Sequence, residues 1–133
     1  MRIPRLTARN DNGALGTITR AILALGVVLR CIGYVRRSVL WTDESAMAHN
    51  VMERSLSALL TVPLDYGQTA PKGFLLLEWL FTRVFGTSDL AFRFVPFVSG
   101  IVSLFLFAAI ARRLLTPSGA LAAVLFFAVG YWF

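Results

Sequence analysis

Two long runs of apolar residues constrain this chain more than any other feature of its sequence. They cover residues 16–35 and 94–111. About 20 helical residues cross roughly 30 Å of hydrocarbon. The chain is also 57% hydrophobic over 133 residues, which is more apolar surface than a soluble domain of that size hides in its core. We therefore predict an all-α, polytopic membrane protein.

The two ends of the chain differ in character. Residues 1–15 are polar and rich in arginine, with a turn signal at residues 10–13, and predict a cytoplasmic tail. Residues 119–133 form a third apolar run of about 15 residues, which is short for a crossing. We expect two complete transmembrane helices and a truncated third, so that residues 16–133 form the N-terminal part of a larger membrane domain. A signal peptide explains the first run less well. Its apolar stretch would have to be residues 21–29, which is short, and Arg30 follows that stretch where small cleavage-site residues are needed.

The distribution of charge predicts an orientation. The net charge is +6, yet the segment 36–93 between the first two spans carries six basic and six acidic residues. The excess lies before the first span, at Arg20 and Arg30 within it, and at Arg112 and Arg113 after the second. The positive-inside rule assigns such flanks to the cytoplasm, and Arg30 can reach the outer interface or a group in the loop. We expect an integral membrane protein with a cytoplasmic N-terminus. This split excess argues against a nucleic-acid-binding surface.

The segment 36–93 is too long for a simple connection, and its pattern predicts two helices along the outer membrane surface. Thr42 or Asp43 can cap a first helix that starts at Glu44 and that Pro63 ends.

A second loop helix is predicted over residues 73–85, with Gly86 just beyond its end. Glu78, Thr82 and Arg83 form a narrow polar stripe on an otherwise apolar surface. Such a helix lies in the membrane interface or packs against other membrane helices.

Asp43 and Glu44 are adjacent carboxylates at the start of the first loop helix. The helix N-terminus favours their ionised forms, and an ionised carboxylate near a hydroxyl group can act as a general base. A purely structural helix cap explains the same residues.

The segment that joins the two loop helices is rich in side chains that bind hydroxylated ligands. They are Asp65, Tyr66, Gln68 and Lys72. A proline-bounded turn with ordinary polar residues is the alternative.

Two further pairs of residues have candidate roles, and the lone cysteine limits the covalent chemistry of the chain. His49 and Glu53 are four residues apart and could contribute to a divalent metal site, but two ligands do not make a site. Arg83 and Arg93 could hold a phosphate group, or could reach the membrane boundary instead. Cys31 is the only cysteine, so no disulfide forms within the chain.

The order of these motifs resembles the N-terminal part of glycosyltransferase family 39, which includes protein O-mannosyltransferases and lipid A aminoarabinose transferases. The matching segments are residues 41–44, 63–74 and 85–93, followed by the Arg-Arg pair at residues 112–113. The resemblance extends over residues 36–133.

The resemblance implies an inverting transfer of sugar from a polyprenyl-phosphate donor, on the non-cytoplasmic side of the membrane. It places the catalytic carboxylate at Asp43 and its supporting neighbour at Glu44, and it implies a location in a bacterial plasma membrane. The candidate substrate-binding residues, selected from their own chemistry, are Asp65, Tyr66, Gln68, Lys72 and Arg93. Lys72 departs from the family, whose members often have a proline or an apolar residue there. The acceptor and any need for a divalent metal stay open.

Two other classes of protein fit parts of the pattern. A small non-catalytic membrane subunit that packs against a larger partner would not need the carboxylate pair or the polar segment 63–74. A transporter fragment fits less well, because residues 94–111 contain no charge.

Overall fold

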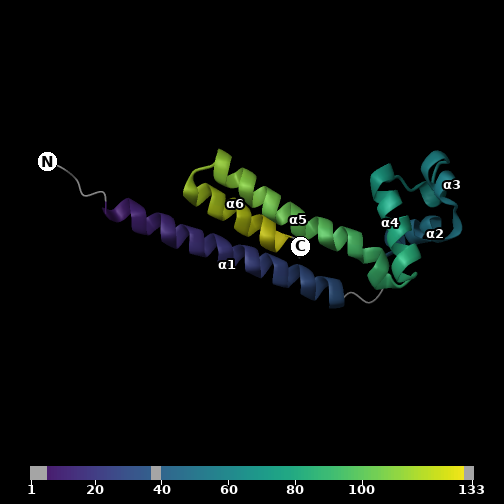
Figure 1. The fold of residues 1–133 in the computed structure, drawn as a ribbon, viewed down its shortest axis with the longest axis horizontal. Helices are drawn as coiled ribbons and strands as arrows, with labels where there is room; N and C mark the ends of the chain where they lie inside the picture. Colours follow the sequence, from purple (N-terminus) through teal and green to yellow (C-terminus); the bar gives the residue numbers. More distant parts are fainter. Residues whose placement is uncertain (1–5, 37–39, 131–133) are drawn as a thin grey trace. The chain divides into compact units, whose positions relative to one another are not determined.

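The computed structural model describes residues 6–36 and 40–130, and these residues form helices and turns with no strand (Figure 1). The chain divides into two compact units, one of residues 1–32 and 99–133 and the other of residues 33–98. The helices are α1 (Leu6–Arg36), α2 (Thr42–Glu53), α3 (Leu56–Thr61), the 3₁₀ turn η1 (Asp65–Gly67), α4 (Lys72–Phe85), α5 (Asp89–Leu114) and α6 (Pro117–Val129).

Two helices are long and apolar enough to cross a membrane, as predicted. They are α5, with a mean hydropathy of 2.3, and the part of α1 from Ala14 to Arg36, with a mean hydropathy of 1.8. α1 begins at Leu6 and continues through the turn predicted at residues 10–13. Asn and Gly lower helix stability by only about 1 kcal/mol or less per residue, so a long helix can contain them.

The first unit packs α1, α5 and α6 through small residues. Ala108 and Ala111 of α5 and Ala120 and Val124 of α6 form its buried cluster, against which Ile22 of α1 packs. Figure 1 shows α5 and α6 as neighbouring helices joined by a short turn. Small side chains allow such close packing between membrane helices.

α6 starts two residues before the predicted third span. The Thr116 hydroxyl caps it by accepting a hydrogen bond from the Gly119 N–H at 3.3 Å, and Pro117 occupies the first turn, where its missing N–H removes no helix bond. The end of the predicted span at residues 131–133 lies outside the described residues.

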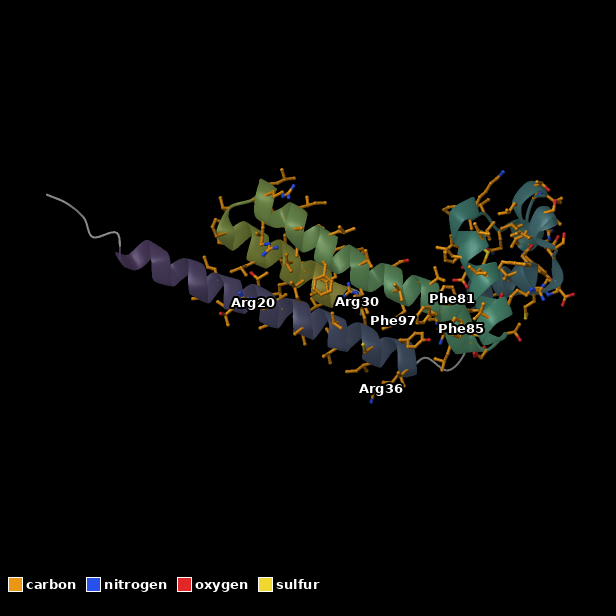
Figure 2. All side chains as sticks on the ribbon, viewed as in Figure 1. Arg20, Arg30, Arg36, Phe81, Phe85 and Phe97 are labelled. Carbon is orange, nitrogen blue, oxygen red and sulfur yellow. The ribbon has the colours of Figure 1, made fainter. Side chains whose placement is uncertain are left out.

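Arg30 does not extend to the loop or the outer interface, as the sequence suggested. Its side chain is 3% exposed, and its guanidinium donates hydrogen bonds to the carbonyl oxygens of Phe127 at 3.3 Å and Ala128 at 3.2 Å. It also donates to the Gly26 carbonyl at 3.0 Å. The last carbonyl groups of a helix lack partners within it, so Arg30 of α1 stabilises the end of α6 (Figure 2).

Gly26 of α1 lies against α5 and α6, and it gives a first prediction. A Cβ atom there would stand 2.8 Å from Cδ2 of the fully buried Leu104 and 3.0 Å from Cβ of Ala128. Gly26→Leu should therefore lower the stability of this unit by about 1–3 kcal/mol, measured as the thermal unfolding midpoint in detergent. Gly16→Leu on the same helix is the control, because no atom lies within 4 Å of its added Cβ. Equal midpoints for the two variants would contradict the packing described.

The single first loop helix predicted from Glu44 to Pro63 is wrong, because the structure breaks it into α2 and α3. Arg54 has an extended backbone, with φ −96° and ψ 145°. Ser55 then caps α3 by accepting a hydrogen bond from the Ala58 N–H at 3.3 Å. Serine favours this position because its hydroxyl satisfies an N–H group that the new helix leaves unpaired.

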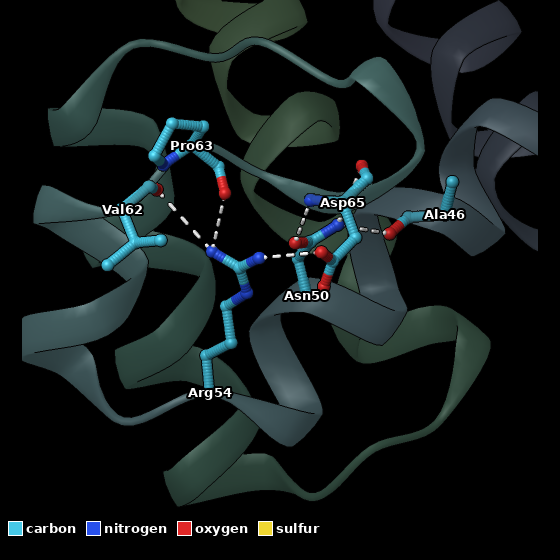
Figure 3. Close-up of polar contacts among 6 residues, drawn as sticks. All are labelled: Ala46, Asn50, Arg54, Val62, Pro63 and Asp65. Carbon is cyan, nitrogen blue, oxygen red and sulfur yellow. Dashed lines mark hydrogen bonds and ion pairs between the residues drawn. The ribbon is translucent and has the colours of Figure 1, made fainter.

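Arg54 and Asn50 hold the chain where it turns back after α3 (Figure 3). The Arg54 guanidinium lies 2.9 Å from the Asp65 carboxylate and donates to the Pro63 carbonyl at 2.8 Å and the Val62 carbonyl at 3.4 Å. The Asn50 side chain, fully buried, accepts a hydrogen bond from the Asp65 N–H at 2.8 Å. These bonds satisfy backbone groups that no helix pairs.

The second loop helix is confirmed almost residue for residue as α4, and Gly86 after it has a φ of 84°, which favours glycine. The direction in which its polar stripe faces is the unexpected feature. Glu78 and Thr82 are buried, whereas Leu80 and Val84 are among its exposed residues. A helix with polar groups inside and large apolar groups outside suits surroundings that are themselves apolar.

Candidate functional site

A cavity of about 260 Å³ lies within the unit of residues 33–98, lined by residues from α2, α4 and α5 and from the chain around them. Most of its wall is apolar, including Met47, Val51 and Phe92. Its polar and charged lining residues are Asp43, Glu44, Gln68, Glu78 and Arg93. Ligand sites are commonly apolar cavities with a few convergent polar groups.

Glu44 connects the start of α2 to α5. Its Oε2 atom accepts a hydrogen bond from the Trp41 backbone N–H at 3.0 Å and lies 3.1 Å from Nη2 of Arg93. The cap of α2 is therefore formed by Glu44 reaching back to Trp41, whereas the sequence favoured the side chain of Thr42 or Asp43. The negative charge also suits the positive end of the helix.

Asp43 differs from its neighbour. Its side chain is exposed, lines the cavity, and has no hydrogen bond or ion pair with any other described residue. The first turn of α2, with no basic side chain of its own, presents this carboxylate at its positive end. Of the two adjacent carboxylates, Asp43 is the one with neither oxygen bonded to another described residue, whereas Oε2 of Glu44 is held by Trp41 and Arg93.

Arg93 is the basic residue of the cavity. It lies in α5, is 7% exposed, and pairs with Glu44. A guanidinium group can bind carboxylate and phosphate oxygens through several N–H groups in one plane. The structure therefore places one permanent positive charge within a cavity that three acidic side chains line.

Glu78 is the residue of the cavity that sequence reasoning did not select. Its side chain is 2% exposed, and neither carboxyl oxygen has a hydrogen-bond partner among the described residues. Burial raises the pKa of Glu78 to about 7 from its usual value of 4.5, because the charged form loses its hydration. The sequence signal that could have identified Glu78 is a single carboxylate on a helix that is otherwise mostly apolar.

The raised pKa of Glu78 gives a second prediction. Between pH 4.5 and 7 the unfolded chain binds fewer protons at this site than the folded chain, so stability falls as pH rises. The free energy of unfolding that protonated Glu78 contributes is fully present below about pH 4.5 and is lost as pH rises through about 7. At pH 8 the loss reaches at most about 3 kcal/mol. Glu78→Gln should remove it, so thermal unfolding midpoints at pH 5.5 and 8 should differ more in the wild type than in this variant. Parallel pH profiles would contradict the prediction.

The four predicted sugar-binding residues do not lie together. Gln68 lines the cavity with Asp43, and it also lines a second hollow that contains Lys72. Asp65 is paired with Arg54, so part of its role is to hold the chain turn. Tyr66 is exposed, with an edge-on contact to the His49 ring at a centroid distance of 5.5 Å.

Tyr66 also has an uncommon backbone conformation, with φ 60° and ψ 25°. A non-glycine residue in this left-handed region costs about 1 kcal/mol or more. The bonds that Asn50 and Arg54 make to Asp65 hold the preceding residue in place.

The remaining candidates lie away from this cavity. His49 and Glu53 do not line it, and within the described part of the chain no three His, Cys, Asp or Glu side chains cluster to hold a metal ion. The Arg83 guanidinium lies over the Trp79 ring at 5.3 Å. This placement favours a packing role for Arg83 over phosphate binding.

Another hollow, lined mainly by apolar residues and distinct from the one that contains Lys72, lies in the same unit. Phe81 and Phe85 of α4 stack with ring centroids 5.3 Å apart (Figure 2). Phe81 also stacks on Phe94 of α5, at a centroid distance of 4.8 Å. The Tyr34 hydroxyl donates a hydrogen bond to the Leu90 carbonyl at 2.8 Å beside this cluster. These residues line about 260 Å³.

The described residues are all-helical, with two helices long and apolar enough to cross a membrane and a charged cavity lined by residues of α2, α4 and α5, as expected of an integral membrane protein with a candidate ligand site. Residues 69–133 match the family of dolichyl-phosphate-mannose-protein mannosyltransferases. Over this part the chain is similar to membrane glycosyltransferases of the mannosyltransferase type, and the resemblance to glycosyltransferase family 39 is confirmed. Comparison with curated proteins and with solved structures gave no match.

The matched region includes α4, α5 and α6, and therefore Glu78 and Arg93. It begins after Asp43 and Glu44, so the roles of these two carboxylates rest on their position in the structure and on the resemblance of residues 41–44.

Proposed function

We propose that this protein is a membrane glycosyltransferase that moves a sugar from a polyprenyl-phosphate donor to an acceptor hydroxyl on the non-cytoplasmic side. The family match supports the reaction class, because that family is named for transfer from a dolichyl-phosphate-linked sugar. The segment between α1 and α5 would face the outside, with the N-terminus in the cytoplasm, as the flanking arginines indicate.

One observation carries the proposal. Asp43 and Arg93 line the same cavity, yet Glu44 pairs with Arg93 while Asp43 keeps its carboxylate oxygens available. A base and a positive charge in one cavity are the groups that transfer from a phosphate donor requires.

In the proposed reaction, Asp43 accepts the proton of the acceptor hydroxyl as its oxygen attacks the anomeric carbon. The bond from this carbon to the phosphate oxygen breaks, and the electron pair leaves with polyprenyl phosphate. Attack from the face opposite the leaving group inverts the anomeric centre. Arg93 offers positive charge to the departing phosphate, and Glu44 positions Arg93 and the start of α2.

The donor class can be tested without knowing the acceptor. Membranes from cells that express the full gene, and from cells that lack it, are incubated with polyprenyl phosphates carrying radiolabelled mannose, glucose or galactose. We expect the gene to increase the transfer of label from the lipid extract to the protein or aqueous fraction for at least one sugar. Equal transfer in both membranes for all three would overturn the proposal and favour a non-catalytic membrane subunit.

A further inference from the structure

Glu78 occupies a position that the packing of its unit would fill with an apolar residue. It is on the buried face of α4, between Leu75 and Thr82. Leu75 belongs to the hydrophobic core of the unit, together with Val51 and Leu59. A buried carboxyl group without a hydrogen bond destabilises a fold, whereas a leucine in the same place would extend this core.

The other polar residue of this face shows how α4 satisfies a buried group. The Thr82 hydroxyl donates a hydrogen bond to the Trp79 carbonyl of the same helix at 3.0 Å. Glu78 has no such bond with the described residues, and it is among the residues that line the cavity. A buried carboxyl group at the wall of a cavity, with its hydrogen bonds unmade, is a candidate to bind a ligand there.

The charges around Glu78 define what it can bind. Asp43 and Glu44 from α2 and Arg93 from α5 line the same cavity, so Glu78 shares the cavity with two carboxylates and one guanidinium. An anionic phosphate group beside Glu78 would be repelled by the carboxylates of Asp43 and Glu44. A hydroxyl group both donates and accepts a hydrogen bond, and it suits a carboxyl group in either protonation state.

We propose that Glu78 is a positioning residue that binds a hydroxyl group of a sugar substrate in the cavity. This inference rests on the proposed function and adds a specificity element to it. Arg93 would bind the phosphate group, and Glu78 would bind the sugar. The hydroxyl group belongs either to the donor sugar or to a sugar acceptor, and the kinetic constants separate these two sources.

The test uses the full-length protein in lipid nanodiscs and two lipid probes, the polyprenyl phosphate sugar that is active in the transfer assay and bare polyprenyl phosphate. Glu78→Leu should weaken binding of the sugar-linked lipid by about 10–100-fold and leave binding of the bare lipid unchanged. Glu78→Gln keeps a hydrogen-bonding group and should restore much of the affinity. Thr82→Val is the matched control, because it removes a polar group from the same face outside the cavity.

The kinetic result identifies the source of the hydroxyl group. A rise in the donor KM with little change in kcat assigns it to the donor sugar, and a rise in the acceptor KM alone assigns it to the acceptor. In the second case the lipid-binding loss would be absent. If Glu78→Leu folds and leaves both KM values and both affinities unchanged, the inference is wrong while the proposed function stands. If the wild type neither transfers sugar nor binds any sugar-linked lipid more tightly than bare lipid, the proposed function fails and this inference fails with it.

Discussion

Asp43→Asn should lower the rate of sugar transfer by about 10²–10⁴-fold without lowering stability. Asparagine has nearly the same shape as aspartate but cannot accept the proton of the acceptor hydroxyl. The exposed Asp43 side chain makes no ion pair or hydrogen bond with another described residue, so its replacement breaks no contact of the fold. The measurement is the initial transfer rate at saturating donor, together with the thermal unfolding midpoint of the purified protein.

Glu53→Gln provides the matched control for this experiment. Glu53 is also an acidic residue of α2, but it lies at the other end of the helix and does not line the cavity. Its replacement should leave the rate unchanged. Transfer at the wild-type rate by a well-expressed Asp43→Asn protein would exclude Asp43 as the base.

Arg93→Met should impair both stability and donor use. Arg93 is 7% exposed and pairs with Glu44, whose side chain is 43% exposed. Removing one partner of a fully buried pair costs about 3–5 kcal/mol, and solvent at Glu44 reduces this to about 1–3 kcal/mol. The loss of positive charge should also raise the KM for the polyprenyl-phosphate donor by at least about tenfold.

A double-mutant cycle separates the ion pair from other contacts of Arg93. Arg93→Met and Glu44→Gln should each lower the unfolding midpoint, and the double variant should lose less than the sum of the two. Arg83→Met is the control, because that arginine is exposed and lies over the Trp79 ring outside the cavity. Strictly additive losses would show that the pair contributes no coupling energy.

The sequence predicted those helices correctly that a single local pattern identifies. Long apolar runs identified the membrane-length helices α1 and α5, and a flanking glycine identified the end of α4. The break at Arg54 was missed because the apolar spacing of α2 continues into α3. The side-chain bonds of Arg54 to residues 62, 63 and 65 depend on a chain reversal that local periodicity does not encode.

The candidate site was predictable in part. Asp43, Glu44, Gln68 and Arg93 were selected from the sequence, and the structure places all four at one cavity. Glu78 was not selected, because an amphipathic pattern gives the polar stripe of a helix but not the direction in which it faces. In water the stripe faces outward, whereas α4 buries Glu78 and Thr82 and leaves Arg83 exposed.

Arg30 was misplaced for a related reason. Its position near the end of an apolar run predicts a side chain directed toward the headgroups. Its hydrogen-bond acceptors are carbonyl groups of α6, almost 100 residues later in the chain. Only the packing of α1 against α6 reveals this partner.

The single Glu44 oxygen that meets both the Trp41 N–H and the Arg93 guanidinium has a consequence for genetic studies of this protein. Asp43 and Glu44 are adjacent and chemically alike, so a screen that scores only loss of sugar transfer would find both intolerant of change. A parallel measurement of protein abundance should separate them. Glu44 variants would be depleted from the membrane before any chemistry is assayed, whereas Asp43 variants would accumulate normally as inactive protein.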